Sequence, residues 1–201
     1  MAAPLGFGFA VPPTGLGAPV GTDQTPVTIG SLANHPAVPA LAFNSDVAVN
    51  SPTGTTNIAI ASVSLPAGLL SPNSASAGLS GNLRRIKVRA YFQGANNANA
   101  KTAGIAFGAA ANVVARCALT VSVVGTAFLE ADITVDGNAA QTGLGYGIAA
   151  TAAVGGTVTA DVSTPVSLTQ NLSVAQSIFF TAVTQTSAAD IILNGYSVEI
   201  Y

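Results

Sequence analysis

The sequence has 201 residues, of which only 7% are charged, and a formal net charge of −2. Typical globular domains carry about 25% charged residues, so small and uncharged polar side chains must cover most of this surface. The charge balance provides no basic field for nucleic-acid binding. No run of about 20 apolar residues predicts a membrane-spanning helix.

Residues 1–55 are rich in proline and glycine and keep neither a strand period nor a helix period. We predict that they form an extended N-terminal arm for anchoring or assembly, with a disordered tail or a small subdomain as the alternative. Disordered tails usually carry more charge and fewer large apolar groups, which favours an arm that buries its side chains against another surface. The candidate assembly contacts in the arm are Phe7, Phe9, Leu16, Ile29, Leu32, Leu41 and Phe43.

From residue 57 onward, β-branched residues alternate with polar ones between Gly, Asn and Pro positions, and no segment keeps a capped helical stripe. Short strands at regular spacing are typical of a sandwich or barrel. We predict an all-β domain over residues 56–201, an eight-stranded jelly-roll sandwich. The strands are expected at residues 57–65, 82–92, 101–107, 113–124, 127–135, 156–162, 177–184 and 191–201, with 143–155 as a long loop or irregular strand.

Two of these strands carry charges of opposite sign on one face. Arg85, Lys87 and Arg89 alternate along the second strand, and Glu130 and Asp132 alternate along the fifth. We expect the two rows to meet across strands or across subunits and to set register more than stability. All five residues are therefore further candidate assembly contacts.

Groups suited to catalysis are few and scattered. The single histidine, His35, lies in the arm, and the single cysteine, Cys117, alternates within a strand as core cysteines do. The carboxylates of Glu130, Asp132 and Asp136 are compatible with a calcium site or a glycosidase pair, but the polar face of an amphipathic strand is the ordinary interpretation. We predict no enzyme activity, no cofactor and no metal site.

Four segments of the predicted domain resemble a widespread group of tailed-phage virion proteins. They are residues 65–70 (LPAGLL), 82–90 (NLRRIKVRA), 96–102 (NNANAKT) leading to Phe107 and Gly108, and 191–200 (IILNGYSVEI). The resemblance covers about residues 57–201 and implies a small jelly-roll domain, commonly trimeric, of the capsid decoration, cement or head-fibre type. The arm lies outside it.

We therefore expect a structural virion protein, made in the host cytoplasm, that binds the major capsid protein on the outside of a phage head, as a homotrimer, and reinforces the head. Neither a nucleic acid nor a membrane is an expected partner. The alternative is a carbohydrate-binding module or a fibre protein that recognises a host glycan. That alternative predicts a groove with an exposed Tyr91 or Tyr146.

Overall fold

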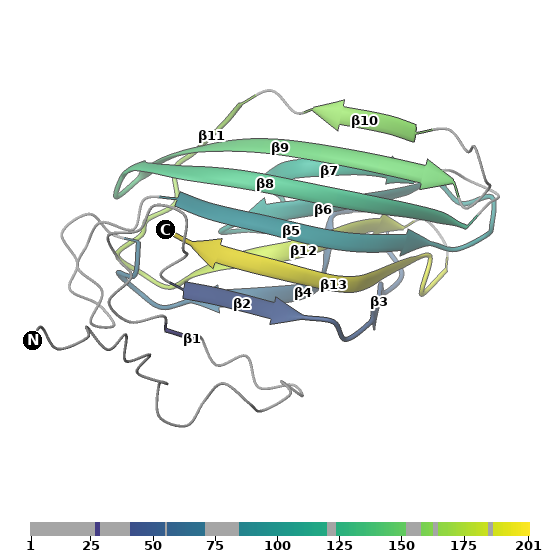
Figure 1. The fold of residues 1–201 in the computed structure, drawn as a ribbon, viewed down its shortest axis with the longest axis horizontal. Helices are drawn as coiled ribbons and strands as arrows, with labels where there is room; N and C mark the ends of the chain where they lie inside the picture. Colours follow the sequence, from purple (N-terminus) through teal and green to yellow (C-terminus); the bar gives the residue numbers. More distant parts are fainter. Residues whose placement is uncertain are drawn as a thin grey trace, which may run out of the picture.

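The computed structural model describes residues 27–28, 41–54, 56–70, 85–119, 124–151, 158–162, 165–184 and 187–201. These residues form two antiparallel β-sheets that pack face to face, and no helix occurs among them (Figure 1). This part of the chain accordingly has no helix long and apolar enough to cross a membrane. The predicted all-β class is confirmed.

Thirteen strands occur in the described residues. They are β1 (Val27–Thr28), β2 (Leu41–Ser45), β3 (Val49–Asn50), β4 (Ile58–Leu65), β5 (Arg85–Gly94), β6 (Lys101–Phe107), β7 (Val113–Leu119), β8 (Gly125–Gly137), β9 (Ala140–Thr151), β10 (Val158–Val162), β11 (Val166–Leu168), β12 (Gln176–Thr184) and β13 (Ile191–Ile200). Each of the eight predicted strands has a counterpart among them. The count of eight is wrong, however, because β1, β2, β3 and β11 were not predicted as strands, and the segment of β9 was predicted as either a long loop or an irregular strand.

The larger sheet has the strand order β1-β2-β13-β5-β8-β9-β10, with β3 also paired to β13 and β11 also paired to β9. The smaller sheet has the order β4-β12-β6-β7. Eight of the strands pair in a nested manner along the chain: β2 with β13, β4 with β12, β5 with β8, and β6 with β7. Pairing of β13 with β5 and of β12 with β6 then joins these ribbons into the two sheets.

The period-2 alternation of β5 places its apolar side chains in the core. Ile86, Val88, Ala90 and Phe92 are all at most 1% exposed, and their neighbours along the strand face away from the core. In β8 the alternation holds in the same way, and β5 pairs with β8 over the whole length of β5. Because burial of one face fixes strand register, the facing polar rows are fixed with it.

Strand β9 covers most of the segment 143–155, for which the sequence predicts a long loop or an irregular strand. Three consecutive inward positions of β9 are the glycines Gly143, Gly145 and Gly147, and β7 of the other sheet lies directly against them. A Cβ atom on Gly145 would lie 2.1 Å from the carbonyl oxygen of Val114, and one on Gly147 would lie 2.9 Å from that of Arg116. The glycines therefore belong to a strand and allow the two sheets to approach closely at this margin.

The sandwich also includes residues that the sequence analysis assigned to the arm. Strand β2 pairs with β13, and its Leu41 and Phe43 side chains are 4% and 6% exposed within the core. These two candidate assembly contacts are thus core residues of their own chain, which leaves them little surface for a neighbouring subunit. Their burial completes the sheet beside β13.

A buried polar network closes the end of the sandwich where β6 and β13 begin. Lys101 is 2% exposed, and its Nζ donates hydrogen bonds to the backbone oxygens of Asn97 (3.1 Å) and Asn99 (2.9 Å). Asp190 is 1% exposed, and its two carboxylate oxygens accept from Asn97 Nδ2 (2.5 Å) and Asn99 Nδ2 (2.8 Å). The loop between β5 and β6 is therefore held by a cation and an anion that bind the same two asparagines.

Candidate functional site

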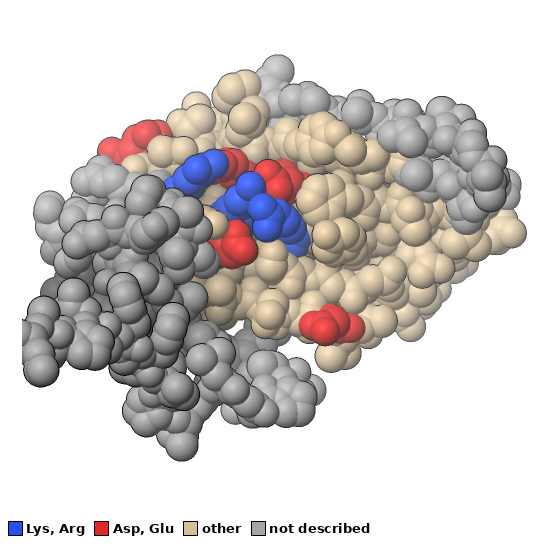
Figure 2. Space-filling model, viewed as in Figure 1, with Lys and Arg blue, Asp and Glu red and all other residues tan. Residues whose placement is uncertain are grey.

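The outward face of the larger sheet carries a compact group of ionisable side chains, which we call the charge cluster. It consists of Arg85, Lys87 and Arg89 on β5, Glu130 and Asp132 on β8, and Glu199 on β13. Figure 2 shows basic and acidic side chains gathered side by side on this face. The basic and acidic rows predicted from the sequence thus meet across neighbouring strands of one chain.

The contacts within the charge cluster link β5 to β8 and, through Arg89 and Glu199, link β5 to β13. Arg85 binds the carboxylate of Asp132, with its Nε 2.8 and 2.9 Å from the two oxygens. Glu130 accepts from Arg89 Nε at 2.9 Å and pairs with Lys87 Nζ at 3.2 Å. The register sets Arg89 directly opposite Glu130, whereas the Arg85–Asp132 and Lys87–Glu130 contacts are diagonal ones between the two strands.

Electrostatically, the charge cluster is balanced, with three cations and three anions. Hydrogen bonding to Asp132 raises the pKa of Arg85, and hydrogen bonding to Glu130 raises the pKa of Arg89. The pKa of Tyr201 is raised by burial and then by its hydrogen bond to Glu199, to which it donates at 2.9 Å. Partly exposed pairs of this kind contribute little stability, so their main effects are register and the absence of a net local charge.

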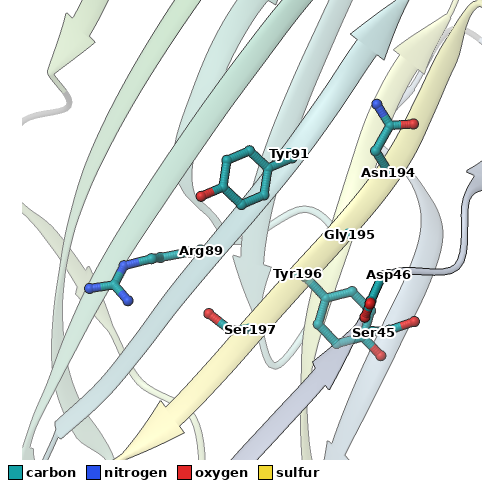
Figure 3. A pocket seen from close by; sticks show the side chains of 8 residues that line it. All are labelled: Ser45, Asp46, Arg89, Tyr91, Asn194, Gly195, Tyr196 and Ser197. Carbon is teal, nitrogen blue, oxygen red and sulfur yellow. The ribbon is translucent and has the colours of Figure 1, made fainter. Parts of the chain in front are cut away.

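Beside the charge cluster lies a shallow pocket of about 410 Å³ on the same face (Figure 3). It lies over β13, between β5 on one side and the end of β2 on the other. We call it the Tyr91 pocket. It is lined by Ser45, Asp46, Arg89, Tyr91, Asn194, Gly195, Tyr196 and Ser197.

A β-bulge in β13 creates the floor of the Tyr91 pocket. The register with β5 pairs Leu193 with Phe92 and Gly195 with Tyr91, so Asn194 is the extra residue. A bulge of this kind turns a side chain away from the regular alternation, and here it exposes Asn194 on the outer face. Gly195 has no side chain to fill the hollow, and a Cβ there would lie 2.9 Å from the backbone oxygen of Ser45.

Tyr91 forms one wall of the pocket and is 55% exposed. Its ring lies 5.1 Å from that of Phe128 in a tilted arrangement, so one side of the ring is supported by the protein. Tyr146 is 36% exposed on β9 of the same sheet, but it does not line the pocket. Of the two tyrosines singled out from the sequence, Tyr91 is therefore the one beside a concave surface.

The groups considered for catalysis do not assemble into a site in the described residues. Glu130 and Asp132 are held in the ion pairs above, and Asp136 accepts a hydrogen bond from Thr142 Oγ1 at 2.9 Å. Cys117 is 1% exposed in β7. His35 lies outside the described residues, and among those that are described no three His, Cys, Asp or Glu side chains are grouped to hold a metal ion.

Of the remaining candidate assembly contacts, Phe7, Phe9, Leu16, Ile29 and Leu32 lie outside the described residues. The sequence analysis missed Ser45, Asp46 and Asn194 as pocket residues. A β-bulge leaves no mark on the period-2 pattern of the sequence apart from the Asn194-Gly195 pair at its centre. Ser45 belongs to β2, which lies in the region predicted to be the arm. The pocket could therefore be recognised only from the three-dimensional arrangement of β2, β5 and β13.

Comparison with protein-family models and with curated proteins gives no match to this chain. Among solved structures, the chain is similar to the CBM2 module of the evolved Dit of Lactobacillus casei BL23 phage J-1. The identity is 12%, the TM-score is 0.27, and the match covers 76% of this chain and 75% of that one. A TM-score this low carries no argument about the fold or the function of the present chain.

Proposed function

We propose that this chain is a structural protein of a phage virion, a decoration or cement protein that binds the major capsid protein on the outside of the head. The observation that carries the proposal is the distribution of charge. Outside the charge cluster, Asp46, Arg116 and Asp136 are the exposed charged side chains among the residues whose burial the structure describes. A surface so depleted of charge resembles the core of a protein interface, which favours contact with other chains.

The strand order supports assigning the sandwich to the jelly-roll type. In the nested pairing, the first of eight strands lies beside the last, the second beside the seventh, the third beside the sixth and the fourth beside the fifth. This is the order obtained when one long hairpin is rolled into two sheets, and jelly rolls are frequent in viral capsid proteins. On this proposal, β9, β10 and β11 are an insertion between the sixth and seventh strands.

The proposed attachment uses the segment before β1. Burial of its phenylalanine and leucine side chains would contribute about 25 cal/mol per Å² of apolar surface, before ordering costs. A homotrimer presents three such segments, and several weak contacts add through high effective concentration. This role requires no catalysis, no cofactor, no nucleic acid and no membrane.

Deletion of residues 2–26 is expected to reduce binding to phage heads at least about tenfold while the sandwich stays folded. The deletion ends before β1, because removal of β2 and β3 would take strands out of the larger sheet. Binding is measured by cosedimentation with purified heads that lack the protein, and folding by circular dichroism. Full occupancy of the heads by the truncated protein would contradict attachment through this segment.

The Tyr91 pocket favours a second candidate function, recognition of a host glycan. Pockets that bind small polar ligands commonly combine an aromatic ring with a few polar groups, and here Asn194, Ser197 and Asp46 are polar residues that line the pocket with Tyr91. Tyr91 offers a rigid, half-exposed surface on which an apolar face of a sugar ring can lie.

Under this second candidate, Tyr91→Ala is expected to abolish saturable binding on a glycan array, because the wall of the pocket is removed. Tyr146→Ala is the matched control, since this tyrosine is exposed on the same sheet but does not line the pocket. Equal loss of binding in both variants would point to a general surface effect, and an array without hits for the unaltered protein would exclude this function.

A further inference from the structure

The Tyr91 pocket is lined by two charged side chains, Arg89 and Asp46, which differ in how their charges are compensated. Arg89 belongs to the charge cluster. Its Nε donates to Glu130 at 2.9 Å, and its Nη1 lies 3.8 Å from the carboxylate of Glu199. Two carboxylates therefore neutralise this guanidinium before any ligand arrives.

Asp46 has no comparable partner. It follows β2 directly, is exposed, and forms no ion pair with any side chain in the ranges that the structure describes. The cations of the charge cluster are already paired with Glu130, Asp132 and Glu199. Within the described part of the chain, the pocket therefore combines one negative charge without an ion-pair partner, that of Asp46, with the exposed ring of Tyr91 on the other side of β13 (Figure 3).

We propose that the Tyr91 pocket takes a sugar unit that carries a positive amino group and rejects units that carry a carboxylate or a phosphate. The inference rests on the second candidate function above and adds the charge class of the ligand. In the proposed arrangement the sugar ring would lie against Tyr91, with its hydroxyl groups toward Asn194 and Ser197 and its ammonium group toward Asp46, all of which line the pocket. The side chains that line the pocket are those shown in Figure 3. An acidic sugar would meet the same carboxylate and find no free guanidinium.

The test uses three tetrasaccharide probes titrated into the full-length protein: glucosamine, its fully N-acetylated form, and galacturonate. At about pH 5.5 and low salt, the glucosamine probe is expected to bind about fivefold more tightly than the N-acetylated probe, because one exposed charge pair is worth roughly that factor. The galacturonate probe should bind most weakly. The preference should vanish at about pH 9, where the amine loses its proton.

Asp46→Asn should bind the glucosamine and N-acetylated probes equally, whereas Asp136→Asn should keep the fivefold difference. Asp136 is a suitable control because it is also an exposed carboxylate and does not line the pocket. If none of the probes binds, the proposed selection for an amino sugar is overturned, and the glycan array described above decides separately whether glycan recognition stands. If the probes bind without preference, or if galacturonate binds best, glycan recognition stands and the proposed charge selection is overturned.

Discussion

Replacing Lys101 with methionine is expected to lower the free energy of unfolding by about 3 kcal/mol. The substitution keeps a long apolar stem and removes only the buried ammonium group. The backbone oxygens of Asn97 and Asn99 then lose their donor, and the buried carboxylate of Asp190 loses the cation bound to the same two asparagines. Urea denaturation followed by circular dichroism measures the effect.

The matched control is Lys87→Met. Lys87 belongs to the charge cluster on the open face of the sheet, where its side chain is 23% exposed and pairs with Glu130. Because water screens and replaces such a contact, the expected loss is below about 1 kcal/mol. Equal losses in the two variants, or a Lys101→Met protein within about 0.5 kcal/mol of the original, would mean that the buried network does not hold this end of the sandwich.

The parts of the fold that could be predicted from the sequence are those in which each strand has one apolar face of large side chains. In β5 and β8 the alternation of isoleucine, valine and leucine with charged residues follows directly from burial of one face, and the predicted faces agree with the structure. The predicted bounds of β6 are also correct. In such strands local pattern and tertiary packing favour the same register.

Strand β9 could not be recognised in this way because its inward face holds glycines in place of large side chains. Period-2 analysis depends on contrast in hydrophobicity, and Gly143, Gly145 and Gly147 give none. The reason for these glycines is the close approach of β7, which lies more than twenty residues away in the sequence. Such a constraint becomes visible only when the two sheets are packed together.

The candidate site likewise has one part that could be predicted from the sequence and one part that could not. Five of the six residues of the charge cluster were anticipated, because Arg85, Lys87 and Arg89 share a strand face and Glu130 and Asp132 share another, and antiparallel pairing brings the two faces together. Glu199 was not, because nothing in the sequence indicates that β13 lies beside β5. For the Tyr91 pocket, the sequence predicted a groove beside an exposed Tyr91 or Tyr146 but not the residues that form its other wall. Its other wall comes from β2, a short strand in a proline-rich region whose Leu41 and Phe43 are drawn into the core by pairing with β13.

Introducing a single methyl group at Gly145 is expected to cost about 2–3 kcal/mol of unfolding free energy. The Cβ atom of a Gly145→Ala variant would lie 2.1 Å from the carbonyl oxygen of Val114 and 2.6 Å from the Cα atom of Ala115. Both are backbone atoms of β7, so no side-chain rotation relieves the overlap and the two sheets must move apart. The loss appears as a lower denaturation midpoint in urea.

Gly137→Ala is the control for the glycine substitution. It lies at the end of β8 in the same hairpin, and the nearest atom to its Cβ would be the Cβ of Ala140 at 3.6 Å, an ordinary van der Waals contact. Adding a methyl group there is expected to change the stability by less than about 1 kcal/mol. If Gly145→Ala proved as stable as Gly137→Ala, β7 would not lie against the glycines of β9, and their alternation along the strand would need a different cause.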